Sequence, residues 1–221
     1  MDRERSGAAS VLRPLLFGDA PAEQWLQDAP EDGEPWLTFR NAQTSLSAGD
    51  VPAAVAAWRS IAESTGLESR QTLQAWHFLR AHGIAPSAAD AATVLAAIAE
   101  VPVGAGLDVL AAYRDGSVRY LNHAGGATLV ESGAAPPALR AAADAWLGVA
   151  GDFAAHVGAW TQPALPPLPA QHGRLMMLTP GGPRFGQGPL EQLTRDARAA
   201  SYMNAATVVL TAVAALPVRG K

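Results

Sequence analysis

Residues suited to acid–base chemistry gather around one predicted β-hairpin. Two stretches in which apolar and polar residues alternate, Leu107–Tyr113 and Val118–His123, flank the dipeptide Asp115-Gly116, which is typical of a two-residue type I′ turn. Such a turn places Asp108 opposite His123, near enough for the two side chains to hydrogen-bond. A carboxylate beside an imidazole can transfer protons, so this pair is the first candidate for chemistry.

An arginine in the same hairpin extends this candidate. With the predicted register, Arg119 shares a face of the hairpin with Asp108 and His123. Together the three could form a general acid–base site or bind a small molecule. The alternative is a structural hydrogen bond at a strand end, with the other side chains solvated. We assign no catalytic residue and keep the three as candidate ligand-binding residues.

A fourth candidate, Arg184, lies in the glycine-rich stretch Gly181–Gly188, which precedes a predicted helix. Helix N-termini bind anions, and Arg184 would add positive charge there. The stretch lacks the Lys and the Ser/Thr of a P-loop, and a tight strand–helix connection explains its glycines equally well. Gly104–Gly106 lacks the third glycine of a dinucleotide fingerprint and leads into a strand, so we expect no nucleotide cofactor.

The sequence contains no motif for metal binding or for a nucleophile. The chain has no cysteine, which excludes disulfides, thiolate metal sites and a cysteine nucleophile. No two histidines stand at a zinc-binding spacing such as HExxH, and no GxSxG motif is present. We therefore expect no metal, no cofactor and a non-enzymatic protein. The five histidines are His77, His82, His123, His156 and His172.

Charge and hydropathy exclude further classes of protein. The net charge is −4 and the arginines are scattered, with Lys221 as the single lysine, so the basic stripe of a nucleic-acid binder is missing. The longest apolar run, Ala205–Leu216, is shorter than the ~20 residues of a membrane span. The N-terminal residues are mixed in charge and interrupted by Arg13 and Pro14, unlike a signal peptide. We expect a cytoplasmic protein that does not enter a membrane.

The pattern of elements predicts an α+β fold in three regions. Residues 1–35 are a lead-in with short helices, residues 36–100 form helical hairpins, and residues 101–221 form an antiparallel sheet with a long C-terminal helix. We expect the hairpins to pack on a sheet of four or five strands flanked by two helices. No Gly/Ser-rich or charged spacer occurs near residue 100, so one unit is favoured over two free domains.

Several boundaries follow from local signals. Trp58 lies on a helical stripe and should be buried between helices. A fourth helix is expected to begin after Ser87 and run through Ile98. Pro136-Pro137 opens another helix, with a possible break at Gly148 or Gly151, and the last helix is expected over Leu190–Leu216.

Part of the helical region resembles a tetratricopeptide repeat. The turn glycine Gly49, the small residue Ala54 and the aromatic Trp58 follow the pattern of the second half of such a repeat. Gly83 stands 34 residues after Gly49, and Ala88 falls where Ala54 stood. The second unit departs from the pattern because an alanine replaces the aromatic residue. A generic cluster of four helices is the alternative.

Two further stretches, LDVLAAYRDGSVRYLNHAGG and LTPGGPRFGQGP, are similar to segments of uncharacterised bacterial proteins, a resemblance that implies no activity. The leading hypothesis is an adaptor or accessory protein whose helical hairpins or sheet edge bind another protein, with a homo-oligomer possible. The alternative is an enzyme or small-molecule-binding protein with a polar pocket lined by Asp108, Arg119, His123 and Arg184.

Overall fold

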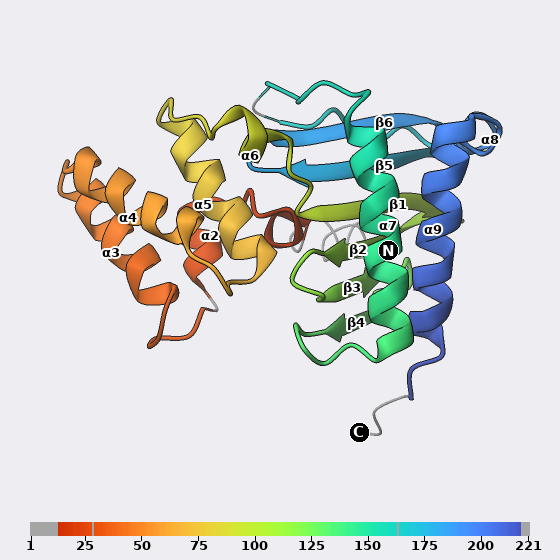
Figure 1. Ribbon diagram of the computed structural model, residues 1–221, viewed down its shortest axis with the longest axis horizontal. Helices are drawn as coiled ribbons and strands as arrows, with labels where there is room; N and C mark the ends of the chain where they lie inside the picture. The colour runs from red at the N-terminus through yellow and green to blue at the C-terminus, as the bar shows by residue number, and fades with distance from the viewer. Residues whose placement is uncertain (1–12, 28, 163, 218–221) are drawn as a thin grey trace.

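Six antiparallel strands form one sheet in the order β4-β3-β2-β1-β5-β6. The computed structural model describes residues 13–27, 29–162 and 164–217, and the sheet stands beside a group of helices (Figure 1). The predicted α+β class is confirmed, and the sheet has more strands than the four or five expected. The strands are β1 (Ala96–Val103), β2 (Gly106–Tyr113), β3 (Val118–Leu121), β4 (Ala127–Val130), β5 (His172–Thr179) and β6 (Gly182–Pro189).

The unexpected strand is β1, near the centre of the sheet. The sequence predicted a helix through Ile98, but helix α6 (Ala88–Ala92) ends early and the chain becomes extended at Thr93. β1 pairs with β2 on one side and with β5 on the other, and its alanines are buried. These tertiary contacts outweigh the intrinsic preference of alanine for helix, which is weak.

Two long helices, α7 (Pro137–Ala154) and α9 (Ala197–Ala214), lie side by side over one face of the sheet (Figure 1). We call this the helix-covered face. α7 follows Pro136, as predicted, and continues through Gly148 and Gly151 without a break. Its Trp146 ring contacts the Tyr202 ring of α9 edge to face at 5.4 Å, and both residues are 0% exposed. Large aromatic side chains of the two helices thus fill the space over the small residues of β1.

The predicted C-terminal helix is divided in two at Asp196. Helix α8 (Leu190–Arg195) ends there, and the Asp196 carboxylate accepts the backbone N–H groups of Arg198 and Ala199 at the start of α9. An aspartate at this position stabilises a helix start. The apolar pattern continues across Asp196, which is why the sequence suggested one helix.

The remaining helices form a second body, which we call the helical unit. Aromatic rings dominate its core: Trp58 is 2% exposed, as predicted, and its ring lies 5.2 Å from the ring of Phe78. Large rings supply most of the apolar area that such a small helical body can bury. The unit consists of α2 (Ala22–Gln27), α3 (Trp36–Ser47), α4 (Val51–Glu63), α5 (Ser69–Ala81) and α6.

Helices α3 and α5 end in the same way. Gly49 and Gly83 both have positive φ, of 81° and 76°. In each case the glycine N–H and the next N–H bond carbonyls of the last helical turn, which is the Schellman arrangement. Beyond these ends the two units differ, because Ala54 is buried against α3 whereas Ala88 is exposed on the short α6. The repeat itself remains a prediction.

Helix α5 joins the helical unit to the rest of the chain through polar groups. The Gln74 amide, 0% exposed, accepts the Ala20 N–H at 3.0 Å and donates to the Ala20 carbonyl at 2.8 Å. At the start of α5, the Ser69 N–H donates to the Asp115 carboxylate of the β2–β3 loop. Directional bonds of this kind fix an orientation more closely than apolar packing does.

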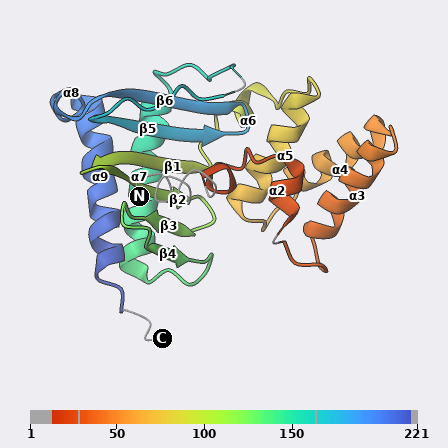
Figure 2. The ribbon, with the colours of Figure 1, turned by 180° about the vertical axis from the view of Figure 1, so that it is seen from behind.

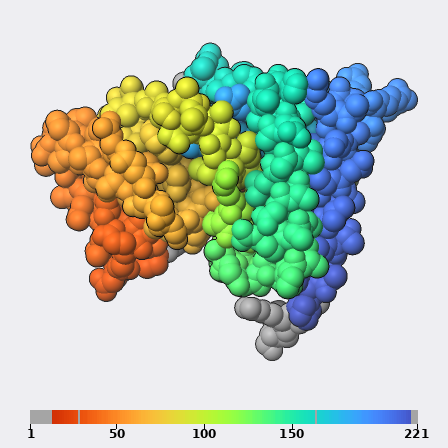
Figure 3. Space-filling model, in the orientation of Figure 1, coloured from red at the N-terminus to blue at the C-terminus, as the bar shows by residue number. Residues whose placement is uncertain are grey.

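We call the face of the sheet opposite α7 and α9 the polar face. The first described segment of the chain lies against it (Figure 2). Leu16 and Phe17 pack there against buried residues of β1, β2 and β5, and the Tyr113 hydroxyl donates to the Leu16 carbonyl at 2.7 Å. In the space-filling view the helical unit projects at one end of the molecule and α9 lies at the other (Figure 3). Within the described ranges, no helix has both the length and the apolar character needed to cross a bilayer.

Candidate functional site

The β2–β3 hairpin has a three-residue loop, so the predicted type I′ turn is wrong. The Tyr113 N–H donates to the Ser117 carbonyl at 3.0 Å, and the Gly116 N–H donates to the Tyr113 carbonyl at 2.9 Å. Within the loop only Gly116 has a positive φ, of 89°, as expected for a type I turn followed by a left-handed residue. The strand pairing is therefore displaced by one residue, with Ala111 opposite Arg119.

Asp108 and His123 nevertheless meet, where β2 begins and the chain leaves β3. The His123 backbone N–H donates to Asp108 Oδ1 at 2.7 Å, and His123 Nδ1 lies 2.8 Å from the same oxygen. The Tyr120 hydroxyl donates to Asp108 Oδ2 at 2.6 Å. Partial burial acts to raise the pKa of the Asp108 carboxyl, but these hydrogen bonds outweigh it and lower that pKa from 3.8.

Tyr120 is the protonated member of this cluster. Burial, together with the bond to Asp108, raises the pKa of its hydroxyl to about 12. At neutral pH the cluster thus holds an ionised carboxylate between two donors. The arrangement fixes the turn after β3 and leaves His123 partly exposed, with 44% of its side chain accessible.

Arg119 lies on the other face of the sheet from Asp108. Neighbouring residues in a strand point to opposite faces, and Tyr120 is the neighbour that bonds Asp108. The Arg119 guanidinium donates to the Val130 carbonyl at 2.7 Å and to Glu131 Oε2 at 2.6 Å, and Arg119 is 3% exposed. The expectation that the three candidates share one face is wrong, because it depended on the displaced register.

Arg184, in β6, is three strands away from β2. Its guanidinium donates to the Ala154 carbonyl at 3.0 Å and to the Val157 carbonyl at 2.7 Å. These carbonyls belong to the end of α7 and to the turn after it, where a cation compensates the negative end of the helix. Arg184 thus anchors a helix end, and the four candidate residues lie in three separate places.

The sequence analysis missed a buried ion-pair cluster on the polar face. Glu100 of β1 and Arg174 of β5 are 1% and 2% exposed, with 3.3 Å between Glu100 Oε2 and an Arg174 nitrogen. Arg13 Nε donates to Glu100 Oε1 at 2.8 Å, and Arg174 Nε donates to Gln187 Oε1 at 3.0 Å. Each charge therefore has an opposite charge or an amide beside it, as buried ions require.

One signal could have pointed to this cluster. Glu100 and Arg174 are each a single charge within an otherwise apolar run, AIAEVPV and GRLMMLT. Charges in such positions are buried and need partners. The pairing of the two strands joins residues far apart in the chain, and the prediction of a helix through Ile98 removed one of those strands.

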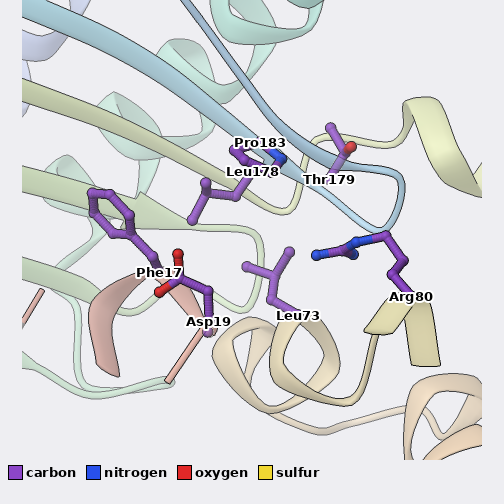
Figure 4. Close-up of a pocket in the computed structure, with 8 residues that line it drawn as sticks. Phe17, Asp19, Leu73, Arg80, Leu178, Thr179 and Pro183 are labelled. Carbon is purple, nitrogen blue, oxygen red and sulfur yellow. The ribbon is translucent and has the colours of Figure 1, made fainter. Parts of the chain in front are cut away.

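A small cavity lies where the helical unit meets the sheet (Figure 4). Its volume is about 20 Å³, enough for one water molecule and too small for an organic ligand. Burial raises the pKa of the Asp19 carboxyl beside it to about 6, despite the nearby Arg13 and Arg80. Arg80 in turn donates to the Pro180 carbonyl at 2.5 Å. The cavity residues are Phe17, Gly18, Asp19, Leu73, Arg80, Leu178, Thr179 and Pro183.

Metal binding finds no support in the part of the chain that the structure describes, where no three His, Asp or Glu residues are grouped so as to hold an ion. Comparison with known protein families, curated proteins and solved structures gives no match for this chain. Function is therefore inferred from the geometry of the molecule.

Proposed function

We propose that this protein is a non-enzymatic accessory protein that binds another protein through the outer face of helix α4. The observation that carries this proposal is a shallow surface, open to solvent, between the side chains of that face. Pro52, Val55 and Ala56 form its apolar part, and Arg59 and Glu63 lie beside them. An apolar centre with polar residues around it is the usual composition of a protein–protein interface.

The position of α4 supports this role. The α3–α4 hairpin belongs to the end of the molecule that projects away from the sheet (Figure 3). Two of its apolar side chains, Leu37 of α3 and Val51 of α4, are 40% and 39% exposed. A partner can therefore approach the hairpin without displacing any other element that the structure describes.

The attachment of the helical unit supports it as well. The buried Gln74 and the contact between Ser69 and Asp115 hold α5 in a fixed orientation, and α4 packs directly on α5. A surface that is already ordered loses less conformational entropy on binding. A helical hairpin on a rigid base suits an adaptor or accessory subunit.

The alternative function, catalysis or small-molecule binding around Asp108, Arg119 and His123, receives less support. Arg119 points to the opposite face, and Arg184 caps α7. Only Asp108 and His123 remain together, and the carboxylate is occupied by three hydrogen bonds. A ligand would have to break these bonds before it could use the carboxylate.

Three related expectations are part of the proposal. The matching helix ends at Gly49 and Gly83 favour a tetratricopeptide-like origin of the helical unit. The net charge of −4 argues against nucleic acid as the partner. A cysteine-free chain suits the reducing cytoplasm, which we propose as the location.

The test is quantitative affinity purification from cells that produce the protein naturally. We expect wild type to retain a stoichiometric partner. The amount of partner recovered with Ala56→Arg should be at least tenfold lower, because an arginine side chain would occupy the apolar centre of the surface. Ala145→Arg is the matched control, since Ala145 is an exposed alanine of α7. Absence of a stoichiometric partner, or equal retention by both variants, would contradict the proposal.

A further inference from the structure

We infer that the β4 edge of the sheet pairs with the β4 edge of a second copy of this chain, which makes the protein a two-fold symmetric dimer. This inference concerns a surface at the sheet, away from α4, and does not rest on the proposed function. Four observations carry it: hydrogen-bonding groups of β4 that no described residue uses, the lack of a described segment that covers this edge, the exposed side chain on this strand, and the absence of charge within it.

The first observation is the direction of the β4 backbone groups. The Asn122 N–H donates to the Gly126 carbonyl at 2.9 Å across the β3–β4 loop, which fixes which residue pairs are hydrogen-bonded. Bonded pairs alternate along an antiparallel ladder, so Thr128 and Val130 direct their N–H and C=O groups to β3. The N–H and C=O of Ala127 and Leu129 therefore point out of the sheet, and no described residue bonds to them.

The second observation is that the other edge of the sheet is protected, whereas nothing in the described ranges protects this one. β6 has prolines as its second and last residues, Pro183 and Pro189, which have no N–H to offer. Its outward Pro183 carbonyl is taken by the Trp160 N–H at 2.7 Å. β4 reads Ala-Thr-Leu-Val, with no proline and no charge. Proteins protect free edges with prolines, charges or covering segments, and β4 has none of these among the described residues.

The exposed side chain gives the third observation. Leu129 is 58% exposed, one of four large apolar side chains of the described chain that stand out in this way. It lies on the polar face, opposite Arg119 of β3. An exposed leucine at the middle of an unprotected strand is the usual signature of strand addition.

The identity of the occupant follows from symmetry and charge. Antiparallel pairing centred on Leu129 sets Leu129 against the same residue of the second copy, and Ala127 against the copy's Glu131. No like charges oppose each other. The Glu131 carbonyl already accepts the Ala134 N–H at 3.0 Å, so the outward groups that remain form about four hydrogen bonds. Such an edge buries less than the ~800 Å² per partner of a standard interface. We therefore expect a weak dimer, with a Kd on the order of 10–100 µM.

The test is sedimentation velocity of the full chain between about 1 and 300 µM. Wild type should pass from monomer to dimer over this range. Leu129→Lys should stay monomeric, because two lysines then face each other across the axis. Val208→Lys is the matched control, since Val208 on α9 is also 58% exposed, and it should dimerise like wild type. Circular dichroism of both variants checks that each is folded.

A covalent test makes the register explicit. The chain has no cysteine, so Leu129→Cys and Val208→Cys each carry a single thiol. Under mild oxidation Leu129→Cys should form a disulfide-linked dimer at least ten times faster than Val208→Cys. Monomeric wild type at 300 µM, equal crosslinking rates, or dimerisation of Leu129→Lys would each overturn the inference. Binding of a foreign peptide at β4 by a monomeric wild type would overturn it too. None of these results bears on the α4 surface.

Discussion

The two faces of the sheet are closed in different ways. The buried cluster under α7 and α9 is apolar, and the hydroxyl of its one tyrosine, Tyr202, bonds only to backbone groups. The polar face holds Glu100 and Arg174 in its interior and connects to the N-terminal segment and α5 through directed bonds. Apolar packing holds most of the first face, where Arg184 bonds the end of α7, whereas buried ion pairs and hydrogen bonds add to the apolar contacts of the second. The charged residues that suggest chemistry do not reach the helical unit: Asp108 holds the turn after β3, Arg119 bonds β4, and Arg184 bonds the end of α7.

The largest expected effect is the loss of a charge from the polar face. Glu100→Ala leaves Arg174 buried without its carboxylate, so the free energy of unfolding should fall by about 3–5 kcal/mol. The matched control is Glu191→Ala, which removes an exposed ion pair with Arg195 and should cost less than about 1 kcal/mol. Urea denaturation measures both. Equal losses would mean that the cluster on the polar face contributes no more than a surface pair.

The next effect concerns the attachment of the helical unit. Gln74→Ala leaves the N–H and C=O of Ala20 without their amide partner in a buried place, and should cost about 2–4 kcal/mol. Gln192→Ala, at an exposed position of α8, should stay within about 0.5 kcal/mol. Thermal denaturation followed by circular dichroism compares the two. A Gln74 variant as stable as wild type would show that directed bonds do not hold α5.

A smaller effect is expected at the loop that reaches α5. Gly116 has a φ of 89°, which a β-branched residue resists, so Gly116→Val should cost about 1–3 kcal/mol. Ser117 is buried and its hydroxyl has no partner in the described part of the chain. Ser117→Val should therefore change stability by less than about 1 kcal/mol. If chemical denaturation gives both substitutions the same cost, the three-residue loop is not formed.

The smallest effect is a pH dependence at the cavity between the two bodies. Burial raises the pKa of Asp19 from 3.8 to about 6. The contribution of this group to stability is therefore present below pH 4 and is lost as the pH rises through 6. Asp19→Asn should raise the free energy of unfolding by about 1–2 kcal/mol at pH 7.5 and leave it unchanged at pH 4. A gain of equal size at both pH values would contradict the burial of an ionised Asp19.

His77 of α5 provides a control of opposite sign. Burial, together with the nearby Arg80, lowers the pKa of His77 from 6.5 to about 4. Its contribution to stability is present above pH 6.5 and is lost as the pH falls toward 4. His77→Gln should therefore make the protein less sensitive to acid, whereas Asp19→Asn should make it more sensitive. Urea titrations at pH 4, 5.5 and 7.5 separate the two residues.

The sequence predicted the parts of the fold that local patterns determine. The hairpin around Gly116, the burial of Trp58 and the start of α7 after Pro136 depend on neighbouring residues, and the structure has all three. The predicted loop length was wrong because the Asp115 carboxylate accepts hydrogen bonds from the Ser117 N–H and from the distant Ser69 N–H, which stabilise the longer loop. The second of these partners cannot be read from the hairpin alone.

The candidate site depended on long-range pairing and was predicted less well. β1 was assigned to a helix because alanines favour helix locally, although a central strand close to packed helices also needs small residues. Without β1, the ion pair between Glu100 and Arg174 could not be foreseen. The contact between Asp108 and His123 was predicted correctly. The predicted register was wrong by one residue, and it therefore placed Arg119 on the same face as these two residues.

The binding surface on α4 is tested most directly by photo-crosslinking in cells that produce the protein naturally. A photoreactive phenylalanine analogue at Ala56 should yield one discrete product with a partner protein. The same analogue at Ala145 of α7, an exposed alanine on the opposite body, should yield none. No product at Ala56, or the same product from both positions, would contradict the claim that the outer face of α4 binds the partner.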